Sequence, residues 1–205
     1  SKANFNAVVF LAALMLLMFG FALGPDTAAL RSAAAGILWL TVLFSGNLAF
    51  HRSYQVELER GALESLLLYP GARSSIFLGK LLANLVFVLL VEVVLIPLAI
   101  VLYDIPLEGR LWAVLLVVLL GTVGFVTLGT FYASMASRSR AREVLLPLLL
   151  FPMLVPVLVA AVEGTSSLMA GDAMGDGSRW IQLLVAFDTI FLGASILAFG
   201  AVIEE

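Results

Sequence analysis

Six long, uninterrupted apolar runs limit what this 205-residue chain can fold into. A helix needs about 20 apolar residues to cross the roughly 30 Å hydrocarbon core of a bilayer. A transmembrane β-barrel would instead show segments of about ten residues in which apolar and polar side chains alternate. The sequence therefore predicts an all-α integral membrane protein, with residues 1–205 as a single transmembrane domain. We expect its six transmembrane helices at residues 5–24, 33–50, 76–103, 111–136, 144–162 and 180–203.

The composition excludes several other classes of protein. Hydrophobic residues make up 62% of the chain and charged residues 12%. In an average soluble domain about 45–50% of the residues are hydrophobic and about 25% are charged. An ordinary soluble enzyme, a disordered chain and a coiled coil are therefore excluded. The net charge of -3 provides no basic surface for nucleic acid. The absence of cysteine excludes disulfides and thiolate metal sites.

The first apolar run has a second interpretation as a secretory signal peptide. Ala22, Leu23 and Gly24 are loosely similar to a small-residue cleavage site. However, the apolar core of a signal peptide is only about 7–15 residues long, and the run at residues 5–24 is longer. We therefore favour a membrane helix that is retained in the mature protein.

The distribution of basic residues predicts the orientation in the membrane. The loops on the cytoplasmic side of a membrane protein carry an excess of Lys and Arg. One side of the predicted bundle carries only Arg31, Arg110 and Arg179. The other side carries Lys2, Arg52, Arg60, Arg73, Lys80, Arg138, Arg140 and Arg142. We therefore expect both termini in the cytoplasm, together with the segment at residues 51–75.

Proline and glycine mark the places where we expect regular helix to be disturbed. Pro147, Pro152 and Pro156 fall in the fifth span, and each removes an amide donor from a helix interior, so this helix should bend or break. Pro97 is expected to kink the third span. Residues 163–179 are rich in Gly and Ser, which is typical of a mobile exterior loop.

Motifs for enzyme chemistry are missing. Gly79-Lys80 lacks the earlier glycine and the following Ser or Thr of a phosphate-binding loop. The sequence has no G-x-S-x-G and no H-E-x-x-H motif. His51 is the only histidine, so no histidine pair is present to bind a metal or a haem, and we favour an interfacial anchor over ligation. We therefore expect no catalytic site, no metal site and no directly bound cofactor.

Three polar side chains fall inside the predicted spans. Glu92 lies near the bilayer centre, where a charged carboxylate costs about 2.5–3.5 kcal/mol on insertion scales. It should therefore face protein or water and be neutral or paired. Asn84 lies two turns earlier, about 80° around the same helix, and Asp188 lies in the sixth span. The sequence leaves two interpretations open, a transport path or proton-linked switch, and a lock between helices.

The cytoplasmic segment contains a short amphipathic helix. Leu63, Leu66 and Leu67 share one helical face, and Pro70 ends the helix. Such a helix either docks into a groove of a soluble partner or lies on the lipid surface. The acidic residues that flank it favour docking to a protein partner over binding to an anionic lipid surface. The residues expected to dock are Glu59, Arg60, Gly61, Leu63, Glu64, Leu66, Leu67 and Pro70.

The same segment resembles a known family. Residues 61–70 follow the pattern G-x-L-E-x-L-L-L-x-P, and Gly79-Lys80 follows as a G-K pair at the start of the third span. Both features are typical of the CcmB family, haem exporter protein B, the membrane subunit of the cytochrome c maturation ABC transporter. The proline-rich fifth span, the length and the six spans are also similar. The resemblance therefore covers nearly the whole chain.

The resemblance implies a fold like that of an ABC-2 type permease in the bacterial inner membrane, surrounded by membrane lipids. It implies a homodimer that works with a cytoplasmic ATPase, CcmA, which would hold ATP and Mg. It also implies the membrane subunits CcmC and CcmD and the haem chaperone CcmE as partners. Haem would then be handled by the complex as a whole.

The expected function is that of a permease subunit that couples ATP hydrolysis to haem export or to the release of haem-loaded chaperone. One alternative is a non-transporting scaffold for haem-handling partners, and another is the permease of a different ABC-2 type exporter. An intramembrane enzyme built on Glu92 and Asp188 is disfavoured, because the sequence offers no nucleophile and no paired metal ligands.

Overall fold

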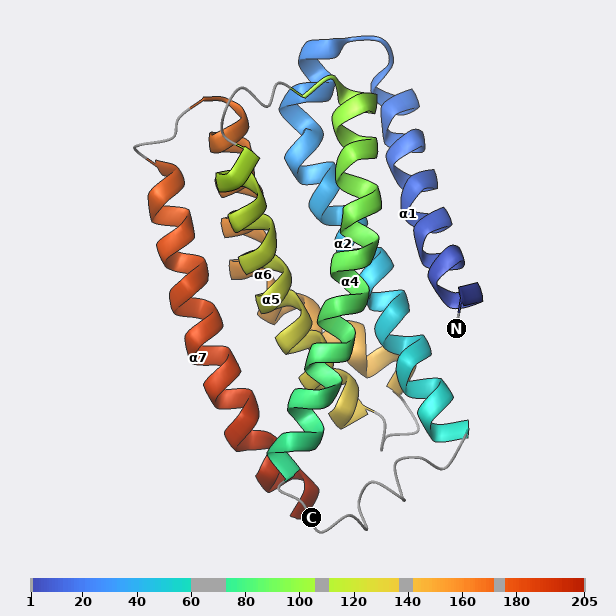
Figure 1. Cartoon of the computed structure of the whole chain (residues 1–205), viewed down its shortest axis with the longest axis vertical. Coiled ribbons are helices and arrows are strands. Elements are labelled where there is room, and N and C mark those ends of the chain that lie inside the picture. Colours follow the sequence, from blue (N-terminus) through green and yellow to red (C-terminus); the bar gives the residue numbers. More distant parts are fainter. Residues whose placement is uncertain (1, 60–72, 106–110, 137–141, 172–175, 205) are drawn as a thin grey trace.

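The regular secondary structure of the described part of the chain is all α-helix. The computed structural model describes residues 2–59, 73–105, 111–136, 142–171 and 176–204. Its elements are α1 (Lys2–Leu23), α2 (Thr27–Glu59), α4 (Arg73–Tyr103), α5 (Leu111–Ala136), α6 (Arg142–Met169) and α7 (Asp176–Glu204), shown in Figure 1. Each of these six helices contains a stretch long and apolar enough to cross a membrane. The prediction of an all-α membrane protein with six spanning helices is confirmed.

Helix α2 begins at Thr27 rather than at residue 33, because local capping extends it beyond the apolar run. Gly24 adopts a φ of 71° and ends α1, which is the left-handed conformation that glycine favours at a helix C-terminus. Asp26 then caps α2, since its Oδ1 accepts hydrogen bonds from the amides of Ala28 at 2.9 Å and Ala29 at 3.2 Å. At its other end α2 continues to Glu59, beyond the apolar span Thr27–Phe50.

The expectation of an exterior loop beginning at residue 163 was wrong, because α6 continues as helix to Met169. Gly164 packs closely against neighbouring helices, where an added Cβ would lie 3.2 Å from Cβ of Trp180. The buried hydroxyl of Thr165 accepts a hydrogen bond of 3.1 Å from the indole Nε1 of Trp39 on α2. Residues that indicate a loop in the sequence are therefore packing positions in the bundle.

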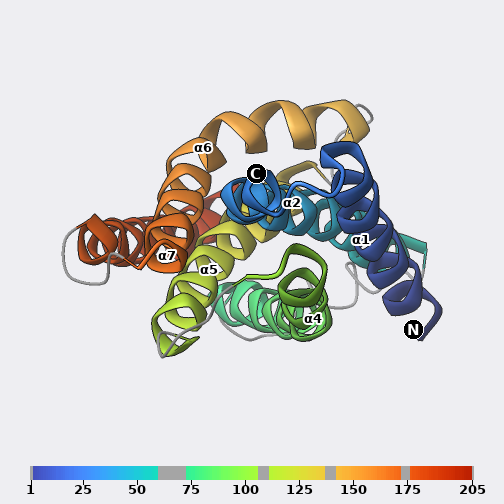
Figure 2. The same cartoon turned by 90° about the horizontal axis from the view of Figure 1, so that it is seen from above.

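Helix α6 is curved. Seen from above, its first half is viewed lengthwise and its second half is viewed end on (Figure 2). It contains Pro147, Pro152 and Pro156 and is nevertheless one continuous helix. Proline within a helix is a common cause of bending. The specific roles of these three residues, and of Pro97 within α4, stay predictions.

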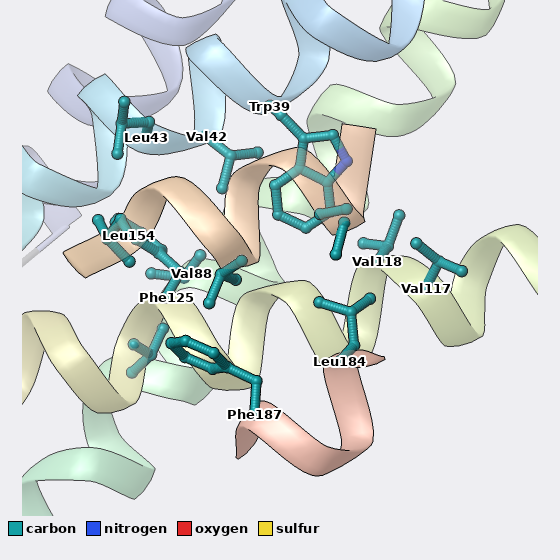
Figure 3. Packing of buried hydrophobic residues seen from close by; sticks show 14 of the residues in the cluster. Trp39, Val42, Leu43, Val88, Val117, Val118, Phe125, Leu154, Leu184 and Phe187 are labelled. Atoms are coloured by element: carbon teal, nitrogen blue, oxygen red, sulfur yellow. The ribbon is translucent and has the colours of Figure 1, made fainter. Parts of the chain in front are cut away.

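Helices α2 and α5 form the centre of the bundle. About 61% of the membrane-spanning window of each is buried, against 17% for α1 and 22% for α7. The main core cluster lies where α2, α5, α6 and α7 meet, and Trp39, Phe125 and Leu184 are part of it (Figure 3). Close approach of α2 and α5 depends on glycine. An added Cβ on Gly121 would lie 2.3 Å from the Trp39 ring.

Helix α4 joins this core to a second cluster formed with α1 and α2. The buried hydroxyl of Tyr103, at the end of α4, donates a 2.7 Å hydrogen bond to the carbonyl oxygen of Leu16 in α1. Just beyond α4, Asp104 forms an ion pair with Arg31 of α2 and accepts a 2.7 Å hydrogen bond from its Nε through the backbone oxygen. These contacts hold α4 between α1, α2 and α5.

Candidate functional site

Glu92 is buried in the middle of the bundle. Its side chain is 2% exposed and belongs to α4. Thr122 on α5 donates a hydrogen bond of 2.6 Å from Oγ1 to Oε1 of Glu92. Thr122 lies at the midpoint of the span Leu111–Ser134. This carboxyl group is therefore located at mid-membrane depth, at the contact between α4 and α5.

A second polar pair joins the same two helices. The amide Nδ2 of Asn84 donates a hydrogen bond of 3.0 Å to Oγ1 of Thr130, and both side chains are buried. Asn84 precedes Glu92 by eight residues, and Thr130 follows Thr122 by eight residues. Eight residues correspond to about two helical turns. The two pairs are therefore successive hydrogen-bonded contacts between antiparallel helices, about two turns apart. The structure places both Asn84 and Glu92 on the side of α4 that faces α5.

Asp188 contacts the other side of α5. It belongs to α7 and is 7% exposed. A Cβ added to Gly124 would lie 2.7 Å from Oδ1 of Asp188 and 3.2 Å from Cγ1 of Val157. The absence of a side chain at Gly124 therefore makes room for this carboxyl group. Thr122 and Gly124 are two residues apart, which places them on opposite faces of α5 with a rise of about 3 Å. Glu92 and Asp188 thus lie at similar depth on either side of α5.

Several buried oxygen atoms near this depth accept or donate no hydrogen bond among the described residues. They are Oε2 of Glu92, Oγ1 of Thr127 and both carboxyl oxygens of Asp188. Glu92 also lines a narrow crevice between α1, α2 and α4, whose other walls are mainly apolar, including Val8, Val42 and Val91. Ser45 lines it too, but its hydroxyl donates to the backbone oxygen of Thr41 in its own helix at 2.6 Å.

The described side chains near Glu92 include no cation. Lys80 within α4 and Asp104 just beyond its end are each twelve residues from Glu92, which corresponds to about 18 Å of helix. The spans Ala3–Leu23 of α1 and Leu111–Ser134 of α5 contain no charged residue. The described residues also contain no group of three His, Asp or Glu side chains that could hold a metal ion.

The polar partners on α5 are the residues that sequence reasoning missed. Thr122 and Thr130 do not stand out among the small and apolar residues of α5. The signal that could have found them is the spacing of eight residues, which they share with Asn84 and Glu92.

Most of the predicted docking segment lies outside the described residues. Glu59 is the last residue of α2. Arg60, Gly61, Leu63, Glu64, Leu66, Leu67 and Pro70 lie in the stretch 60–72, outside the described ranges. The docking assignment therefore stays a prediction.

Comparison with known proteins identifies the family. Residues 1–205 match the family model described as CcmB protein. Heme exporter protein B of Rhodobacter capsulatus is 34% identical over 154 residues, 75% of this chain and 69% of the relative. The Haemophilus influenzae protein of the same name is 33% identical over 149 residues, 72% and 66% of the two chains. The protein of that name from Pseudomonas aeruginosa is 28% identical over 182 residues, 88% and 80%. With six membrane-spanning helices and a family match along its full length, this chain belongs to the CcmB family.

Proposed function

We propose that this chain is the permease subunit of the ABC transporter for cytochrome c maturation. The observation that carries the proposal is the match to the CcmB family over residues 1–205. The multi-pass helical architecture supports it, because a permease must surround or gate a path through the bilayer. The chain itself is not an enzyme. Hydrolysis of ATP, with Mg, belongs to the partner ATPase CcmA.

The cytoplasmic segment at residues 51–75 transmits the work of the ATPase to the membrane helices. Helix α2 supports this role, because it continues nine residues past Phe50 to Glu59. At a rise of 1.5 Å per residue, that extension is about 13 Å long. It leads directly into the docking residues, which begin at Glu59 itself. Force applied to this segment would therefore act on α2, one of the two central helices.

The basic residues support an orientation with both termini in the cytoplasm. Arg52 and Arg73 then lie on the same side as the ATPase. The chain acts as a homodimer in the bacterial inner membrane, with CcmC-like and CcmD-like membrane subunits and a CcmE-like haem chaperone on the opposite side. Its output is haem export or the release of haem-loaded chaperone, and haem binds elsewhere in the complex rather than to a ligand from this chain.

Co-purification in mild detergent tests the proposal. The wild-type chain should bring down a stoichiometric ATPase subunit. The double variant Leu66→Asp, Leu67→Asp should insert in the membrane normally but lose the ATPase, because two charges replace the apolar docking face. Ser65→Asp is the control for added charge, since it introduces one carboxylate off that face, and it should keep the ATPase. A wild-type preparation without ATPase would support the scaffold alternative and contradict the permease assignment.

A further inference from the structure

We propose that Glu92 is a proton-binding site in the middle of the membrane. Its carboxyl group is held as the neutral acid, and its proton exchanges with water through the crevice between α1, α2 and α4. On exchange the proton passes from Oε2 to a water molecule, and the reverse transfer restores the acid. This site is a property of the chain itself and is independent of the partner ATPase.

The first observation is the hydrogen bonding of the two carboxyl oxygens. Oε1 accepts one hydrogen bond, from Thr122 at 2.6 Å. Oε2 has no partner among the described residues, and the side chain is 2% exposed. An ionised carboxylate has about four acceptor positions, and a charge at this depth costs about 2.5–3.5 kcal/mol on insertion scales. One hydroxyl donor cannot stabilise the ionised carboxylate at this depth. It is enough for the C=O oxygen of the neutral acid.

The second observation is the charge on the helices packed against α4, which are α1, α2, α5 and α7. The described side chains of α1 and α5 include no charged group. Arg31 of α2 is engaged with Asp104 at the end of α4. On α7, Arg179 lies near the start of the span Gly177–Phe199, and Asp188 lies across α5.

The tyrosines of these helices whose side chains the structure describes also lie away from the carboxyl group. Tyr103 is eleven residues from Glu92 along α4 and donates to the Leu16 carbonyl. Tyr132 is ten residues from Thr122 along α5. Eleven and ten residues correspond to about 16 Å and about 15 Å of helix. No described group is therefore placed to neutralise an ionised Glu92.

The third observation is the crevice between α1, α2 and α4, which is the route by which the proton would exchange with water. Glu92 is the one ionisable residue among those that line it, and Gly46 and Ala49 form part of its α2 wall. The crevice borders the Glu92 side chain directly. A modest separation of α1, α2 and α4 would therefore admit water to Oε2. Thr122 remains on the opposite side, where it keeps Oε1 fixed against α5.

Asp188 provides an internal comparison. It lies at similar depth and also lacks hydrogen-bond partners among the described residues. Its Oδ1 lies against Gly124 of α5, and Asp188 is not among the residues that line the crevice. Both carboxyl groups should carry protons, but only Glu92 has the crevice as a route to water.

Infrared difference spectroscopy of the purified chain in lipid nanodiscs tests this inference. The wild-type minus Glu92→Gln spectrum should contain the C=O stretching band of a protonated carboxylic acid. In D2O this band should shift, while the corresponding band in the wild-type minus Asp188→Asn spectrum should stay unshifted on the same timescale. Carboxylate bands from Glu92, or a Glu92 band that does not shift in D2O, would overturn the proposal.

A second variant keeps the test valid if Glu92→Gln does not fold. Thr122→Val leaves the carboxyl group in place and removes the hydrogen bond to Oε1. The acid band of Glu92 should then move to higher frequency, because its C=O group is no longer an acceptor. Thr189→Val is the matched control, since that exposed hydroxyl donates to the backbone oxygen of Val185 in its own helix. An acid band that Thr122→Val leaves unmoved would contradict the assignment to Glu92.

Discussion

The hydroxyl group of Thr122 lies 2.6 Å from Oε1 of Glu92 and joins α5 to α4 at the middle of the membrane. The pair formed by Asn84 and Thr130 joins the same helices two turns away. Two successive polar contacts fix the register of these antiparallel helices, because a shift along either helix would break both. The candidate site is therefore also part of what positions α4.

The first prediction concerns the stability of this register. Thr130→Val should lower the free energy of unfolding by about 1 kcal/mol, since hydrogen bonds between membrane helices contribute about 0.6 kcal/mol on average and about 1.7 kcal/mol at most. Equilibrium unfolding in bicelles measures the change. Thr189→Val, on an exposed face, should have no measurable effect. Equal effects from the two variants would mean that the Asn84 contact contributes nothing.

The second prediction concerns the close packing of α2 on α5. Gly129→Ala should lower the free energy of unfolding by about 1–3 kcal/mol, because overpacking in a tight core forces neighbouring groups to move. An added Cβ there would lie 2.1 Å from Cε2 of Phe50. Gly193→Ala is the matched control, because an added Cβ at Gly193 meets no atom within 4 Å. A Gly129→Ala variant whose free energy of unfolding equals that of Gly193→Ala would contradict the close packing of Phe50 against Gly129.

The six spans could be predicted from the sequence because a chain in lipid must satisfy its backbone hydrogen bonds internally, and a long apolar run achieves this as a helix. The ends of the helices depend on single contacts that hydropathy does not report. Asp26 starts α2 early by capping it. Thr165 accepts a hydrogen bond from Trp39 within α6, in a stretch whose composition favours a loop.

The candidate site was predictable in part for a related reason. Glu92 stands out in an apolar run because its carboxyl group cannot be left unsatisfied in lipid. Threonine does not stand out, because its hydroxyl can bond to its own helix. Thr41 does so, donating to the Ile37 backbone oxygen at 2.8 Å. Thr122 instead donates its hydrogen bond to Glu92 on α4. Only the packing of the two helices shows whether a threonine bonds within its own helix or to a neighbouring one.

The third prediction concerns the role of Glu92 in transport. Glu92→Gln keeps the side-chain shape and an oxygen that can accept from Thr122, but it cannot release a proton. Expression and membrane insertion should stay normal, while cytochrome c maturation and the ATPase activity of the complex should fall several-fold. Unchanged activity in both assays would leave Glu92 with a packing role alone.

The fourth prediction concerns direct haem binding. Haem iron in proteins is commonly held by His, Met, Tyr or Cys; this chain has one histidine, His51, no cysteine, and no His or Met pair spaced i, i+4 to hold the iron from one helix. The isolated subunit should therefore show no stoichiometric haem, and His51→Ala should keep most function. Titration of the purified chain with haem provides the measurement. A sharp six-coordinate spectrum that disappears in His51→Ala would contradict this prediction.

The most direct measurement of the proposed function is the amount of covalently bound haem in the c-type cytochromes of the host bacterium. Deletion of the gene for this chain should abolish that haem while haem synthesis and the apocytochromes remain normal. The wild-type gene should restore it, and the Leu66→Asp, Leu67→Asp variant should not. Normal levels of covalent haem in the deletion strain would contradict a role for this chain in cytochrome c maturation.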